Sequence, residues 1–168
     1  MSPILAAGLL IGGLCGAFTF VMGFTGWYKD PVMVNVFIPT VVVMEVGALI
    51  WGLRKTAAMG RTYSGQVVAG TLMAVIGAAI IFVCSYLFTS VAFPSYFEDI
   101  NAMARQVLQG QGKTPAEIQA FLDDQSASQT PLMNALVGFI MTIVTGVIAS
   151  AVIAAFIRQR PDVLTAGV

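Results

Sequence analysis

Histidine is absent from this 168-residue sequence, and only 10% of the residues are charged, against roughly 25% in ordinary soluble domains. The absence of histidine removes the commonest metal ligand and the usual general base at neutral pH. It excludes Ser/His/Asp and Cys/His catalysis. Eight basic and eight acidic residues give zero formal net charge, so no strongly basic surface indicates nucleic-acid binding.

Cysteine is also scarce, with only Cys15 and Cys84, and both lie in apolar stretches. This excludes a disulfide framework and a CxxC zinc or redox site. The segment 110–114 ends like a phosphate-binding Walker A loop, but Val107 stands where that motif needs its first glycine. No acidic cluster within the apolar stretches indicates a metal site. We therefore predict a protein that is not an enzyme and has no cofactor.

What the sequence has in excess is hydrophobic residues, at 58%. A soluble domain of this size has too little interior to bury that much apolar surface. Roughly 20 apolar residues cross a membrane as a helix, and four stretches reach that length, at about 4–24, 31–53, 66–93 and 131–157. The first is too long for a cleavable signal peptide and lacks a preceding basic residue. We predict an all-α integral membrane four-helix bundle, forming a single domain over 1–168.

Basic residues flanking the predicted spans indicate the orientation. Short segments on one side carry Arg54, Lys55, Arg61, Arg158 and Arg160, whereas the other side carries Lys29, Arg105 and Lys113. By the positive-inside rule, both termini are expected in the cytoplasm. Aromatic residues at the ends of the spans then predict two interfacial belts, an outer one of Trp27, Tyr28, Phe93, Tyr96 and Phe97 and an inner one of Trp51 and Tyr63.

The outer loop, 94–130, carries helix signals of its own. Ser95 with Glu98 and Thr114 with Glu117 each fit a capping box, and Gly110 separates the two segments. We predict a helical hairpin with an acidic outer face. Its short, half-apolar helices need a surface to lie on, which the bundle, the lipid interface or a partner would supply.

Glu45 is the one charged residue type inside a predicted span. Such residues face the bundle and mark function by default. Thr145 lies at matching depth in the fourth span, with Thr142 one turn away, so their hydroxyls are the expected hydrogen-bond partners. Two hypotheses follow: a proton or cation relay, or an interhelical hydrogen bond that fixes packing. We favour packing, because a lone carboxyl without a second ionisable group makes a short relay.

Small residues recur every four positions in three of the spans, a spacing that lets helix backbones approach closely. Most of these stripes are expected to pack within the chain, while one is a candidate for self-association. The stripes consist of Gly8, Gly12 and Gly16; Gly70, Ala74 and Ala78; and Gly146, Ser150 and Ala154.

The order of these features resembles one bacterial family, the four-helix membrane proteins of domain-of-unknown-function family 4199. The likeness rests on the exit from the second span at 50–55, the glycine-marked start of the third at 60–70, and the stretch from the acidic hairpin through the last span. This chain departs from the family in its short hairpin and in Ala57 and Ala58. The resemblance implies the topology and a bacterial origin, but no activity and no catalytic residues.

Together these features predict a non-enzymatic inner-membrane protein that serves as a packing or accessory subunit of a homo-oligomer or a larger membrane complex. Its partners would be the lipid bilayer and either itself or another membrane protein. The alternative is a small proton- or cation-coupled transporter or channel using Glu45. A lipid-modifying enzyme with Glu45 as acid or base is disfavoured, because the sequence supplies no nucleophile, metal or second acid.

Overall fold

The computed structural model describes residues 1–157, and this part of the chain is all-helical, without a strand. A short 3-10 helix, η1 (Trp27–Lys29), links the first two long helices, and a π-helical segment, η2 (Phe88–Ala92), extends the third. The six α-helices are α1 (Pro3–Phe24), α2 (Pro31–Ala57), α3 (Tyr63–Leu87), α4 (Tyr96–Gly110), α5 (Pro115–Ser126) and α6 (Pro131–Ile157).

Four of the helices are long and apolar enough to cross a membrane. They are α1, α2, α3 with its η2 extension, and α6. The prediction of four long apolar helices is therefore confirmed. Within the described residues, the predicted hairpin segment contains two shorter helices, α4 and α5.

The second and third helices differ from their predicted bounds. Helix α2 continues past the basic pair to Ala57, because Thr56 and Ala57 are buried against the rest of the bundle. Helix α3 begins at Tyr63, where the Thr62 hydroxyl accepts the Gly65 N–H at 3.4 Å. Hydropathy marks apolar content, so it misses helical turns that are polar in composition.

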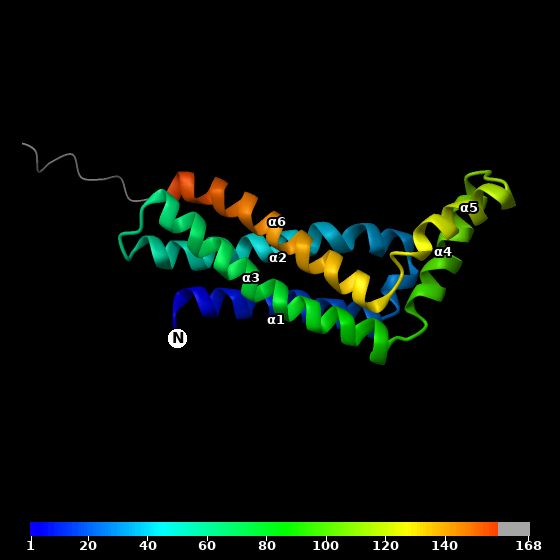
Figure 1. Ribbon diagram of the computed structural model, residues 1–168, viewed down its shortest axis with the longest axis horizontal. Helices are drawn as coiled ribbons and strands as arrows, with labels where there is room; N and C mark the ends of the chain where they lie inside the picture. Colours follow the sequence, from blue (N-terminus) through cyan, green and yellow to red (C-terminus); the bar gives the residue numbers. More distant parts are fainter. Residues whose placement is uncertain (158–168) are drawn as a thin grey trace, which may run out of the picture.

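The four long helices lie side by side (Figure 1), and α3 makes extensive contacts with both α1 and α6. The N-terminus, the α2–α3 turn and the end of α6 lie at one end of the molecule, while α4 and α5 project from the other. We call these the terminal end and the hairpin end. The core is formed by Ile11, Leu49, Leu53, Met73 and their neighbours.

One of the two predicted capping boxes is confirmed and the other is wrong. At the start of α5, Thr114 and Glu117 cap each other's backbone N–H groups. At the start of α4, the Ser95 side chain makes no capping bond and donates instead to Asp99 at 3.2 Å. Asp99 is already fixed by contacts with the bundle, and this tertiary anchor replaces the local cap.

Candidate functional site

Glu45 lies where α2, α3 and α6 meet, and its side chain is only 2% exposed. It shares a buried face of α2 with Ala48, Leu49 and Gly52. The structure places Thr145 of α6 opposite it, with the hydroxyl oxygen 2.7 Å from Glu45 Oε2. This contact joins residues 100 positions apart. Glu45 thus links α2 directly to α6.

The Thr145 hydroxyl has more acceptors than it can serve. Its oxygen also lies 2.9 Å from the Met141 carbonyl and 3.1 Å from the Thr142 carbonyl. One hydroxyl carries one hydrogen, so it cannot donate to all three. A neutral carboxylic acid at Glu45 would donate its own hydrogen to Thr145 and leave the threonine hydrogen for a carbonyl. That arrangement makes one more hydrogen bond than a carboxylate does.

The other carboxyl oxygen, Glu45 Oε1, has no hydrogen-bond partner within residues 1–157. It lies 3.0 Å from the point that a Cβ on Gly146 would occupy. The same point overlaps the Cβ of Ala74 on α3. The missing side chain at Gly146 therefore gives the carboxyl group its space between the two helices.

Thr142, the second expected partner, is buried. In the described part of the chain, its hydroxyl makes no hydrogen bond to Glu45. It lies three residues from Thr145, about 4.5 Å along the helix axis, and Thr145 takes the contact with Oε2. Cys15 approaches from α1, and its thiol donates to the Val41 carbonyl at 3.9 Å. Residues 1–157 hold no group of three or more Cys, Asp or Glu side chains arranged to bind a metal.

The small-residue stripes pack helix on helix inside the chain. Side chains from α3 cover the α1 stripe, with Ile76 over Gly8, Ile80 over Gly12 and Cys84 over Gly16. Between α3 and α6, Ser150 lies directly over Gly70, and Ala74 over Gly146. These contacts use all three stripes within one chain. The stripes therefore serve packing between helices of one chain.

A second buried polar group lies toward the terminal end and was missed by the sequence analysis. Gln66 is fully buried, and the Thr56 hydroxyl donates to its Oε1 at 2.6 Å. The Gln66 amide nitrogen and the Ser150 hydroxyl have no partner among residues 1–157. A signal was present, because Gln66 stands one turn before Gly70 on the same helical stripe.

At the hairpin end, Asp99 of α4 ties the projecting helices to the bundle. Its Oδ2 accepts the Tyr28 hydroxyl at 2.7 Å and lies 2.9 Å from Lys29 Nζ. These hydrogen bonds, first that from Lys29 and then that from Tyr28, lower the pKa of Asp99. Tyr28 itself is buried against Phe88 and Tyr96. Within the predicted outer belt, Tyr28 therefore packs inside the protein, because its ring fills the bundle end and its hydroxyl holds α4.

The fold and these contacts define a class of protein, an all-helical chain with four helices able to cross a membrane and a buried acid–threonine contact between two of them. The chain belongs to the family described as protein of unknown function (DUF4199), which matches residues 6–159. This confirms the resemblance seen in the sequence. Comparisons with curated proteins and with solved structures found no match.

Proposed function

We propose that this protein is a non-enzymatic, multi-pass protein of the bacterial inner membrane that acts as an accessory subunit of a homo-oligomer or a larger membrane complex. The observation that carries the proposal is the α4–α5 hairpin, which projects past the end of the bundle in Figure 1. None of the α4 residues is buried. Helix α5 buries only Ile118 and Leu122, so most of the hairpin surface can contact a partner.

The hairpin is nevertheless held in one position. Asp99 fixes the start of α4 to η1 through Tyr28 and Lys29. The side-chain amides of Asn101 and Gln129 exchange two hydrogen bonds of 2.8 Å, which join α4 to the segment leading into α6. A surface that is ordered before binding loses less entropy when it binds. This rigidity supports a recognition role.

The hairpin also presents apolar side chains that are partly exposed. Phe121 is 42% exposed and Val107 37% exposed. They stand among the acidic residues Glu98, Glu117, Asp123 and Asp124. Aromatic anchors within a polar rim are the usual composition of a protein interface. The favoured partner is therefore another polypeptide at the membrane surface.

The proposed orientation has both termini in the cytoplasm and the hairpin outside. Arg54, Lys55 and Arg61 flank the terminal end of the bundle, and short basic segments stay on the cytoplasmic side. Arg158 and Arg160, which the same rule uses, lie outside the described residues.

Gentle detergent extraction of the full chain tests the accessory role. A stoichiometric complex should be recovered, and Phe121→Asp should release the partner while the bundle keeps its helical content. Met59→Asp introduces the same charge at an exposed site of the terminal end, and this control variant should keep the complex. A strictly monomeric wild type with no co-purifying polypeptide would contradict the proposal.

The alternative function is transport of protons or a cation through Glu45, and the unpartnered Oε1 is the observation that favours it. Two cavities, one lined by Gly47, Trp51 and their neighbours and one beside Tyr28, do not include Glu45. Proteoliposomes containing the wild type would show flux if transport occurs, and Glu45→Gln would abolish it. Absence of proton and cation flux in the wild type would reject this alternative.

A further inference from the structure

The outward face of α2 carries a groove near the terminal end. It has a volume of about 500 Å³ and is lined by Gly47, Ile50, Trp51, Arg54, Lys55 and Ala58. These positions recur every three or four residues, so they form one continuous face of the helix. At 1.5 Å per residue, the face extends about 16 Å along the axis. It begins in the apolar part of α2 and ends beyond its basic pair.

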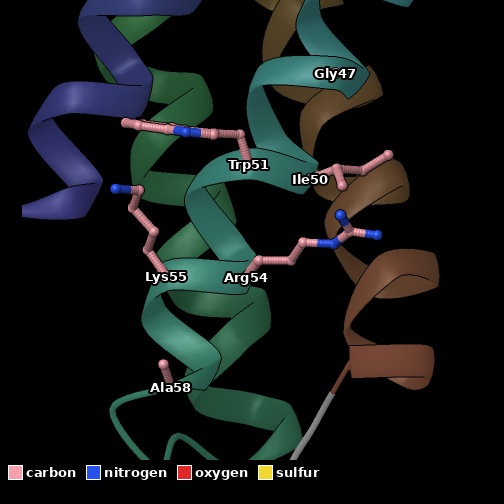
Figure 2. A pocket seen from close by; sticks show the side chains of 6 residues that line it. All are labelled: Gly47, Ile50, Trp51, Arg54, Lys55 and Ala58. Carbon is pink, nitrogen blue, oxygen red and sulfur yellow. The ribbon is translucent and has the colours of Figure 1, made fainter.

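The shape of the groove follows from the side chains along it. Gly47 has no side chain, and nothing lies within 4 Å of the position that a Cβ would take. In Figure 2, Trp51 and Lys55 extend to one side of α2, while Ile50 and Arg54 extend to the other. Because Gly47 and Ala58 are small, the surface between the two rows of larger side chains is recessed. The result is an open trough with an apolar half and a cationic half.

Both cations lack an acidic partner in the part of the chain that the structure describes. The salt bridges of residues 1–157 involve only Lys29 and Lys113. Lys55 Nζ lies 4.7 Å from the centroid of the Trp51 ring, and this cation–π contact leaves its N–H groups available. Glu45, the nearest acidic residue in the helix sequence, is buried and directed at Thr145. Within residues 1–157, the groove therefore has two positive charges without an acidic partner.

We propose that this groove binds an anionic phospholipid, with the phosphate between Arg54 and Lys55 and an acyl chain along Ile50 and Gly47. The apolar half suits the hydrocarbon, and the basic rim suits the headgroup at the membrane surface. Trp51 marks that interface, where aromatic rings gather. Arg and Lys have long, flexible stems, so their charged ends can converge on one headgroup. The inference uses the membrane embedding of the bundle and is independent of the accessory role.

Native mass spectrometry of the full chain in neutral detergent tests the site with phosphatidylglycerol and phosphatidylcholine as probes. The wild type should retain phosphatidylglycerol in preference, and Arg54→Gln with Lys55→Gln should reduce that binding about tenfold or more. Gly47→Leu should reduce it as well with both charges intact, because the side chain fills the trough. Arg61→Gln removes a positive charge that lies at the terminal end of the bundle but outside the groove. This variant should leave lipid binding unchanged.

Each opposite result overturns the proposal. One is equal retention of the two lipids by the wild type, and another is an equal loss in Arg61→Gln. Displacement of phosphatidylglycerol by millimolar inorganic phosphate would show that the groove recognises phosphate alone. A co-purifying polypeptide that Gly47→Leu removes, without a change in bound lipid, would assign the groove to a protein partner. Thermal unfolding of each variant without added lipid verifies that the bundle is intact.

Discussion

At the residue scale, Glu45 is placed by three helices at once. The contact with Thr145 was predictable, because counting inward from the helix ends brings the two residues to one depth. The role of Gly146, which leaves space for the Glu45 carboxyl group, was not predictable. It depends on Ala74 of α3 and on the carboxyl group of α2 occupying the same small volume, and no spacing within one helix encodes such a three-helix contact.

The Glu45–Thr145 contact should contribute measurably to stability. Interhelical hydrogen bonds in membrane proteins average about 0.6 kcal/mol. Glu45→Gln keeps a hydrogen-bond partner for the Thr145 hydroxyl and should stay within about 0.5 kcal/mol of the wild type. Glu45→Leu removes that hydrogen-bond partner and should lose about 1 kcal/mol. The free energy of unfolding in mixed micelles tests this, and a Leu variant as stable as the wild type would contradict it.

Gly146 should tolerate no added methyl group. A Cβ there would overlap Ala74 Cβ and press on Glu45 Oε1, so α6 would have to move away from α3. We expect Gly146→Ala to cost about 1–3 kcal/mol of unfolding free energy. Gly138→Ala is the matched control on the same helix, because its nearest contact, with Ile81, would be an ordinary 3.8 Å. Equal stability of the two variants in the same micelles would show that the close approach is not needed.

At the scale of elements, the hairpin was predictable as two helices, but its attachment to the bundle was not. Pro115 and the Thr114–Glu117 capping box mark where α5 begins, and these are local signals. The bond from Tyr28 to Asp99 joins residues 71 positions apart. It also explains why the local cap at Ser95 is absent, since Asp99 draws the serine hydroxyl toward the anchor.

The hairpin anchor should weaken in acid. The lowered pKa of Asp99 means that its ionised form is the one stabilised by folding. This stability is fully present above the unfolded pKa of about 3.9, and it is lost as the pH falls through the lower folded value. The protection of the α4 backbone amides from hydrogen exchange, taken relative to their intrinsic exchange rates at each pH, should therefore fall below about pH 4.

Asp99→Asn supplies the control for the acid effect. Asparagine cannot form the ion pair with Lys29, so exchange in α4 should already be faster at neutral pH and should lose this component of its pH dependence. Exchange in α3 should be unaffected in both proteins. If the α4 backbone amides exchange at the same rate in the wild type and in Asp99→Asn, the anchor does not hold the hairpin.

At the scale of the whole molecule, composition and hydropathy predicted the four long helices, because length and apolar content alone decide whether a helix can cross a membrane. The pairing of helices needed the structure. Glycine stripes on α1, α3 and α6 predicted close packing, but which stripe meets which neighbour depends on the opposing Ile76, Ile80 and Ser150. Gln66 shows the limit of hydropathy, since a polar residue at a helix start is fully buried.

In the proposed topology, the bundle crosses the membrane with the hairpin on one side and the α2–α3 turn on the other. Single-cysteine labelling in intact bacterial cells tests this most directly, with Cys15 and Cys84 replaced by alanine. Gln111→Cys in the hairpin should react with a membrane-impermeant maleimide. Met59→Cys, also exposed, should react only after the cells are permeabilised. Labelling of both sites in intact cells, or of Met59→Cys alone, would contradict the account.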